Sequence, residues 1–391
     1  MKVAFLLAAR FLRRRSSALL SASSRSALVA VGLGVASLVV ALALMSGYRR
    51  ALREGILAAS GHLLIVLTPA QHAPNLEKAI LSQQGVAVVG RTFFLPGVAS
   101  TDAQTQGEVV TLKAAEHLPP FAPPLPAADR GPLPVAMGGG LARRLGVRSG
   151  DSVVLQLALP SGRLAYLPAK VGAVFETAFA ELSESWVLCD FAALERRGGG
   201  WGPPLLEVFL RDPDRAPEVA EKLAASLGPG VLVHSWSELN RELFAALRWQ
   251  KLTLALVLSL IVGVGAFEVA SALVVLITER RRELGILLAM GASRALVRQT
   301  VVLAGGLVGA GGVLFGALFG LSVVALLSAL GVPAFSPELA SVYMVSRIPW
   351  EVQVVDVAWV VGVGLAEVLV ASLAAARPLA AREPAEVLRW V

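Results

Sequence analysis

The chain has 391 residues, of which 55% are hydrophobic and only 16% charged. This is too apolar for soluble domains alone and indicates that much of the chain lies in a membrane. A single cysteine, Cys189, excludes an internal disulfide and cysteine-rich metal sites, and the four scattered histidines have no metal-ligand spacing. The formal charge of +7 comes from arginines beside apolar runs, which is typical of a membrane flank and not of a nucleic-acid interface.

The chain begins with a basic segment followed by a long uncharged one. Residues 1–25 mix apolar side chains with six Lys and Arg, which predicts a cytoplasmic interfacial helix. Residues 26–48 carry no charge and as a helix span about 35 Å, enough to cross a hydrocarbon core of about 30 Å. A cleaved signal peptide is the alternative, but the apolar stretch is too long and Met45 to Tyr48 is a poor cleavage site. We therefore expect an uncleaved first membrane helix.

Residues 49–251 have the size of one or two compact domains. Both ends of this segment read as strand, helix and strand, which suggests one subdomain closed by distant parts of the chain. A middle part contains further short strands, and its Pro-rich stretch, Leu118 to Pro134, is expected to be a surface loop. The expected strands are 62–67, 86–89, 152–159, 170–175, 206–210 and 231–233, and the expected helices are 75–83 and 216–226.

A helix is predicted to leave this domain for the membrane. Ser235 and Glu238 fit a capping box, and no proline follows before Thr278. One continuous helix of about 43 residues would be a rod of roughly 65 Å. The alternative is two helices that meet near Lys251.

Three more membrane helices are expected, at residues 252–278, 300–330 and 357–376. Lys and Arg are frequent in 1–25, in the loop 279–299 and in the tail 377–391, but the loop 331–356 holds only Arg347. Because basic residues concentrate on the cytoplasmic side, both termini are expected there. The fold class is therefore a membrane protein of four transmembrane helices with a large α+β periplasmic domain, 49–251, inserted between the first and second.

The loop 279–299 combines charge with an apolar stripe. Leu284, Leu287 and Leu288 recur at helical spacing, Gly291 is placed to end the helix, and Ser293 to cap the next. The charged start can be a solvated run or a lipid-headgroup contact, whereas the stripe also suits docking into a partner's groove. The candidate docking residues are Glu279, Arg280, Glu283, Leu284, Leu287, Leu288, Met290 and Gly291.

Two features of the membrane spans stand out. Gly312, Gly316 and Gly320 are spaced by four, which lets helices approach closely, either within the four-helix unit or at a subunit interface. Glu268 and Glu367 lie inside apolar spans, where a charged carboxylate is costly. Each is expected either to form an interhelical hydrogen bond as a protonated carboxyl or to take part in proton coupling.

No phosphate-binding loop, nucleophile elbow, zinc-protease or kinase motif occurs in the sequence. The chain is therefore expected to be no enzyme and to bind no cofactor itself.

Several short motifs occur in a characteristic order. They are Ala9 to Leu12, Met45 to Tyr48, Gly61 to Ile65, Leu145 to Val147 with Gly150 to Val153, Trp236 to Asn240 with Phe244 to Leu247, Glu279 to Ser293, Val342-Tyr343 with Ile348-Pro349, and Glu383 to Arg389. In this order they resemble the lipoprotein-releasing ABC transporter permease family, the LolC/LolE type within the MacB/FtsX-like permease group. The resemblance runs nearly end to end.

The resemblance implies a multi-pass protein of the bacterial inner membrane that works with a cytoplasmic ABC ATPase dimer, on which ATP and Mg would bind. It implies a second permease subunit, alike or different, a lipoprotein cargo, surrounding membrane lipids and a periplasmic lipoprotein carrier. Closure of the ATPase would act through the 279–299 loop and the long helices to extract the lipoprotein, a process called mechanotransmission. By resemblance, Met45, Leu42, Leu256 and Leu260 would line the lipid cavity.

The sequence departs from the family pattern at three places. Glu268 stands where the family usually has a polar amide, the proline near the fourth helix is displaced to Pro378, and only Pro160 to Ala169 is available for a carrier-docking hook. Two alternatives are a MacB-like efflux or secretion permease working with a periplasmic adaptor, and a membrane sensor or regulator of cell-wall enzymes. An ATPase and triacylated protein in the purified complex would favour lipoprotein release over both.

Overall fold

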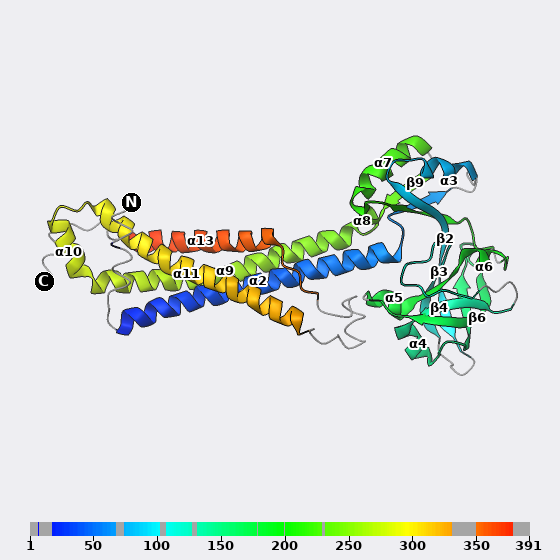
Figure 1. Cartoon of the computed structure of the whole chain (residues 1–391), viewed down its shortest axis with the longest axis horizontal. Coiled ribbons are helices and arrows are strands. Elements are labelled where there is room, and N and C mark those ends of the chain that lie inside the picture. Colours follow the sequence, from blue (N-terminus) through cyan, green and yellow to red (C-terminus); the bar gives the residue numbers. More distant parts are fainter. Residues whose placement is uncertain are drawn as a thin grey trace. The chain divides into compact units, whose positions relative to one another are not determined.

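The computed structural model describes residues 7, 18–67, 74–101, 107–126, 131–177, 179–198, 200–228, 231–330 and 349–377. The chain divides into two compact units, one helical and one α+β (Figure 1). The helical unit comprises Met1–Gly47, Ala246–Val332 and Pro349–Val391, and the α+β unit comprises Tyr48–Ala245 and Pro333–Ile348. Three of the expected segments lie largely outside the described residues. Of the interfacial helix expected at 1–25, residues 1–6 and 8–17 are not described, and neither are residues 331–348 of the expected loop 331–356 or residues 378–391 of the tail.

Within the part of the chain that the structure describes, four helices are long and apolar enough to cross a membrane, as predicted. They are α2 (Ala18–Ala59), α9 (Arg241–Glu279), α11 (Arg294–Ala329) and α13 (Val354–Ala376). Three of them continue well beyond the apolar stretches read from the sequence, because charged residues such as Arg50 and Arg248 end an apolar run without breaking a helix.

The helices of the helical unit run alongside one another (Figure 1) and share one apolar core. Its members are mostly small or β-branched, which lets the backbones approach closely. Large apolar side chains also point outward, and Leu318 and Phe267 are 66% and 71% exposed. A helix that is apolar on all sides suits a lipid environment. The core includes Val31, Val35, Leu38, Val262, Val269, Val313 and Val368.

The described residues of the α+β unit form one sheet of nine strands in the order β3-β7-β4-β6-β5-β2-β8-β1-β9, with an additional pairing of β3 to β2. The strands are β1 (Leu63–Leu67), β2 (Val86–Ser100), β3 (Glu108–Ala115), β4 (Leu133–Gly138), β5 (Ser152–Ala158), β6 (Leu164–Phe175), β7 (Trp186–Asp190), β8 (Leu205–Leu210) and β9 (Val231–Ser235). The connecting helices are α3 (Pro74–Leu81), α4 (Gly139–Leu145), α5 (Ala180–Ser185), α6 (Phe191–Glu195), η2 (Pro213–Arg215) and α7 (Ala216–Leu227).

The two ends of the α+β unit interleave in the sheet. β1 lies between β8 and β9 and is antiparallel to both, and β8 lies between β1 and β2. The strands of the first strand-helix-strand unit therefore alternate in the sheet with those of the last one. The helices α3 and α7 of the two units lie close together beside these strands (Figure 1). Their buried side chains, Ile80 and Leu223 among them, share a core with Leu63 and Val208. The prediction of one subdomain closed by distant segments is confirmed.

The middle of the chain forms a second core. The predicted strands at 152–159 and 170–175 are present as β5 and β6, but β3, β4 and β7 were not predicted. β4 begins at Leu133, inside the stretch expected to be a surface loop, and all six of its residues are buried. That part of the loop prediction is wrong, because a strand buried on both faces lacks the alternation by which strands are recognised.

The predicted capping box is present. Ser235 Oγ accepts a hydrogen bond from the Glu238 N–H, and Glu238 Oε2 accepts one from the Ser235 N–H. The helix that it starts, α8 (Trp236–Leu239), is only four residues long. It ends at Asn240, which leaves helical geometry at φ −109° and ψ 17°, and whose backbone N–H and side-chain amide both donate to the Trp236 carbonyl. α9 then runs 39 residues through Lys251, so the break lies at Asn240 and not at Lys251.

Candidate functional site

The loop between the second and third membrane helices folds into a short helix, α10 (Arg281–Ala289). Gly291 follows it at φ 92°, a conformation that glycine adopts without strain, and the Ala292 N–H donates to the Leu287 carbonyl. Ser293 Oγ then accepts from the Leu296 N–H and starts α11. Hydrogen bonds within the loop therefore fix the end of α10 and the start of α11.

The apolar side chains of α10 differ in exposure. Leu284 is buried, and Leu287 and Leu288 are half-buried, so the stripe read from the sequence faces mainly inward. The apolar side chains open to a partner are Ile286, 52% exposed, and Met290, 79% exposed. Ile286 was missed because it lies off the stripe, although its i, i+4 spacing from Met290 was a readable signal.

Arg280 holds the turn between α9 and α10. Its Nη1 donates to Glu283 Oε1 at 2.6 Å, while Nε and Nη2 are buried without a partner among the residues that the structure describes. Glu279 is the last residue of α9. The charged residues at the start of the loop are therefore not all solvated, because Arg280 and Glu283 form an ion pair that holds the turn.

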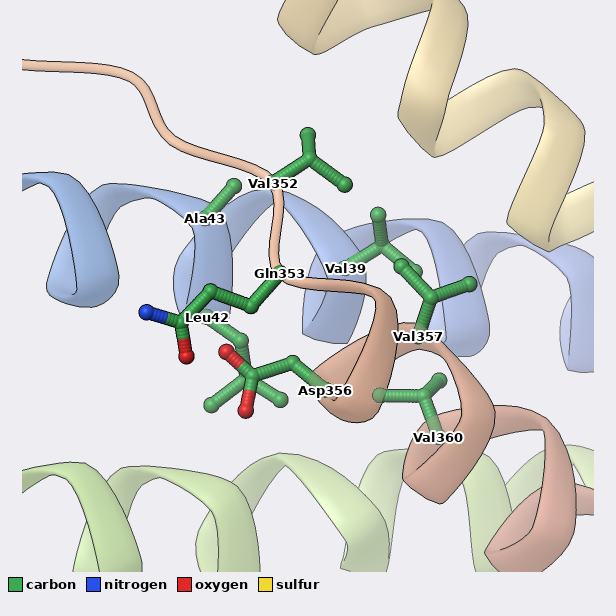
Figure 2. A pocket seen from close by; sticks show the side chains of 8 residues that line it. All are labelled: Val39, Leu42, Ala43, Val352, Gln353, Asp356, Val357 and Val360. Atoms are coloured by element: carbon green, nitrogen blue, oxygen red, sulfur yellow. The ribbon is translucent and has the colours of Figure 1, made fainter.

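The four residues carried over for a lipid cavity differ in their exposure. Leu42 is buried and lines a small pocket between α2 and α13, with room for about one water molecule. Figure 2 shows the Leu42 and Asp356 side chains close together in this pocket. Met45 is half-buried, and Leu256 and Leu260 on α9 are 58% and 65% exposed. The exposed pair is therefore the more accessible to an acyl chain.

A polar cluster joins three helices beside this pocket. Lys251 Nζ lies 2.8 Å from both carboxylate oxygens of Asp356, and Ser46 Oγ donates to Asp356 Oδ2 at 2.8 Å. Lys251 Nζ also lies 3.1 Å from Ser46 Oγ. Sequence reasoning missed this cluster. Its signal was that Lys251 and Asp356 each directly precede an apolar span and so fall at the same end of the helical unit.

The segment before α13 lies against α2 at the same level. The Glu351 N–H donates to the Ala43 carbonyl, and a Cβ on Gly47 would lie 2.4 Å from the Pro349 carbonyl oxygen. Only glycine fits at position 47 without displacing this segment.

The three glycines of α11 lie against α2. A Cβ on Gly316 would lie 2.3 Å from the Gly32 carbonyl oxygen, and the equivalent distance from Gly312 to Leu28 O is 3.0 Å. Gly320 similarly meets Ala36. These residues therefore serve close packing of α11 on α2 within one chain.

The two intramembrane carboxyls have different surroundings. Glu268 Oε1 accepts a hydrogen bond from Ser26 Oγ at 3.4 Å. Glu367 Oε2 is buried and has no partner among the described residues. Both side chains are half-buried, so each lies partly inside the helical unit.

No group of three or more His, Cys, Asp or Glu within the described residues could hold a metal ion.

Comparison with known proteins gives two kinds of match along this chain. Residues 255–384, which contain most of α9 and all of α10, α11 and α13, match the family model described as FtsX-like permease C-terminal. The lipoprotein-releasing system transmembrane protein LolC of Xylella fastidiosa (strain Temecula1) is 28% identical, with 97% of each chain covered. The corresponding LolE protein of Haemophilus influenzae is 23% identical, with 99% of each chain covered.

A solved structure also matches part of the chain. The extracellular domain of the noncanonic ABC-type transporter YknZ from Gram-positive bacteria is 13% identical, with a TM-score of 0.30, and the match covers 44% of this chain and 99% of that one.

From the family model, residues 255–384 form an FtsX-like permease domain, and over nearly its whole length the chain is similar to the LolC and LolE transmembrane proteins of lipoprotein-releasing systems.

Proposed function

We propose that this chain is a permease subunit of an ABC transporter that extracts lipoproteins from the inner membrane for transfer to the outer membrane. The observation that carries the proposal is the end-to-end similarity to LolC, 97% of both chains, together with an FtsX-like permease domain. The protein would be a multi-pass inner-membrane protein with both termini in the cytoplasm and the α+β unit in the periplasm.

The physical requirement is an apolar receptor and an energy source. Each acyl CH₂ group removed from the bilayer costs about 0.8 kcal/mol, so a lipoprotein does not leave spontaneously. Met45, Leu256 and Leu260 supply apolar surface on α2 and α9, and both helices extend in the chain into the α+β unit. We assign the acyl-chain contact to these three side chains, whereas Leu42 is buried in the small pocket between α2 and α13.

The energy would come from a cytoplasmic ABC ATPase dimer that binds ATP and Mg. We assign its docking to α10 and to Met290 directly after it, where Ile286 and Met290 are exposed and Leu284 is buried. Arg280 and Glu283 would keep α10 at a constant angle to α9, so that movement of the ATPase moves the helix. A second permease subunit, the same or different, and a periplasmic carrier would complete the system.

The decisive experiment is purification of the chain from its own cells with the copurified proteins identified by mass spectrometry, followed by ATP-driven release from proteoliposomes. An ABC ATPase together with bound triacylated protein, released when ATP is added, is the expected result. An ATPase with a periplasmic adaptor and no lipoprotein would instead indicate efflux, and the absence of any ATPase would indicate a sensor.

A variant locates the acyl-chain contact. Met45→Arg should lower the amount of copurified lipoprotein, because a guanidinium among acyl chains must be desolvated. Leu326→Arg on α11, 58% exposed, is the matched control for placing a charge on an outward-facing membrane residue. Equal occupancy in both variants would remove Met45 from the cavity.

A further inference from the structure

The α+β unit contains a buried ion pair that none of the preceding features explains. Lys113 on β3 and Glu207 on β8 have side chains only 1% and 2% exposed, and Nζ lies 2.8 Å from Oε1. The Lys113 ammonium also lies 5.2 Å from the Phe94 ring centroid and 6.0 Å from that of Trp186. Burial lowers the pKa of Lys113, and Glu207 opposes that shift.

The remaining hydrogen bonds of the pair go to the end of the first membrane helix. Lys113 Nζ donates to the carbonyl oxygen of Ala59, the last residue of α2, at 2.8 Å. Glu207 Oε1 accepts from the Gly61 N–H at 3.1 Å. A cation at the C-terminal carbonyls of a helix is favourable, because the helix dipole places partial negative charge there. The pair therefore forms hydrogen bonds to the last residue of α2, Ala59, and to Gly61, two residues further along the chain.

Gly61 makes this contact possible. A Cβ at position 61 would lie 2.9 Å from Glu207 Cβ and 3.1 Å from the Val208 N, so no larger residue lets the chain approach β8 so closely. The geometry is specific to the backbone that leaves α2.

The pair also joins two strands that each carry one of the two cores of the unit. Lys113 is paired with Phe94, and Glu207 with Gly90, four residues apart on the shared strand β2, so both side chains point to one face of the sheet. The neighbours of Lys113 on β3 belong to the core of the middle segment. Those of Glu207 on β8 belong to the core of the interleaved ends. The end of α2 is thus tied to both halves of the sheet at one point.

Stability alone is a weak reason for such a pair. Removing two charges from water is costly, and apolar replacements of similar volume are often neutral or stabilising. Ion pairs in this situation can instead specify one arrangement among several that apolar packing would allow. Here the arrangement specified is the position of the α2 end on the sheet.

We propose that Lys113 and Glu207 are positioning residues that lock the end of α2 onto both halves of the α+β unit, so that displacement of the first membrane helix moves the whole unit. This inference rests on the proposed function in one respect only, that such displacement drives release. The locking itself can be measured without any cargo.

The test uses the full-length protein in its complex and the double variant Lys113→Met/Glu207→Leu, which removes the charges and all three hydrogen bonds. Leu155→Ala is the control, since Leu155 is fully buried in β5 and its truncation destabilises the same unit without touching α2. The first readout is lipoprotein released per ATP hydrolysed. We expect this ratio to fall at least about fivefold in the double variant, the lower end of measured coupling between sites, and to stay near wild type in Leu155→Ala.

The second readout is the distance distribution between spin labels, measured without cargo. One label replaces Glu54, exposed on α2, and the other replaces Lys170 on β6 or Lys222 on α7, one in each half of the unit. Both distributions should broaden in the double variant and not in Leu155→Ala.

The outcomes separate the two proposals. Distributions as narrow as those of the wild type would overturn the locking role, and so would a release ratio no lower than that of Leu155→Ala. A wild-type complex that releases no lipoprotein would refute the proposed function. The spin-label distances alone would then test whether Lys113 and Glu207 lock the end of α2.

Discussion

Lys251 and Asp356 are 105 residues apart in the chain, yet the Lys251 Nζ lies 2.8 Å from both oxygens of the Asp356 carboxylate. Their side chains are 20% and 16% exposed, so the pair is largely shielded from water. Ser46 completes the cluster from α2. The ion pair thus joins the start of α13 to α9, and the Ser46 hydrogen bond joins it to α2.

Lys251→Met should therefore destabilise the helical unit by about 2 kcal/mol, because the Asp356 carboxylate loses a charged partner in a poorly solvated place. Thermal unfolding of the detergent-solubilised protein checks this. Lys251→Met/Asp356→Leu, which leaves no charge unpaired, should recover most of the loss. A double-mutant cycle without coupling between the two positions would contradict the account.

The exposed residues of α10 should decide ATPase binding. Ile286→Asp and Met290→Asp are each expected to reduce copurification of the ATPase while leaving the thermal unfolding temperature of the protein unchanged, because both side chains already face outward. Leu284→Asp should lower the unfolding temperature as well, since Leu284 is buried. Arg282→Asp, exposed on the same helix, makes the charge more negative by two units without removing an apolar side chain, and so controls for the effect of charge. Undiminished ATPase recovery in both outward-facing variants would exclude α10 as the docking element.

Gly316→Ala should disturb the packing of α11 on α2. The new methyl group would lie 2.3 Å from the Gly32 carbonyl oxygen, so the helices must separate at a cost of about 1–3 kcal/mol. Gly306→Ala on the same helix meets no described atom within 4 Å and should be neutral or slightly stabilising. Unfolding in detergent compares the two, and equal stability would show that the close approach is dispensable.

The stability of the α+β unit should fall in mild acid through His62. Burial lowers the pKa of the His62 imidazole from its ordinary value of 6.5, and Arg53 adds to the shift. Its Nδ1 accepts a hydrogen bond from the Leu210 N–H at 2.9 Å, which only the ring unprotonated at Nδ1 can do. The unfolded chain therefore binds more protons than the folded one below about pH 6.5, and stability is lost as the pH falls from there through the lowered value.

His62→Asn tests this, because the amide oxygen can replace Nδ1 as acceptor but does not titrate. The variant should flatten the loss of thermal stability between about pH 7 and pH 5. His234→Asn, on the adjacent strand β9, is the control. If His62→Asn retained the full loss, another group would be responsible.

Glu268→Gln and Glu367→Gln distinguish hydrogen bonding from proton coupling. We expect both variants to keep wild-type release at neutral pH and an unchanged pH profile, since a glutamine side chain can fill the same place and accept the same hydrogen bond from Ser26. Glu367→Leu controls for the loss of polarity. A pH profile displaced in either glutamine variant would support proton coupling instead.

Sequence reasoning reached the features that depend on local order. The four apolar spans follow from the free energy of transfer, because stretches such as 300–330 have no other stable environment. The caps at Ser235, Gly291 and Ser293 follow from hydrogen bonds made within a few residues. Strands with alternating exposure, such as β5, were also readable. Strands buried on both faces, such as β4, were not, because their pattern resembles any short apolar run.

The amino-acid sequence by itself determined that this is a membrane protein with four apolar helices, an α+β insertion and a capped amphipathic loop, because each of these depends on interactions between near neighbours or on composition. Only the tertiary structure decided that Lys251 meets Asp356, that Lys113 meets Glu207 at the end of α2, and that Ile286 instead of Leu284 faces outward. The physical reason is the range of the interactions. The sequence shows that a buried charge requires a partner, but which residue becomes the partner depends on how distant segments pack.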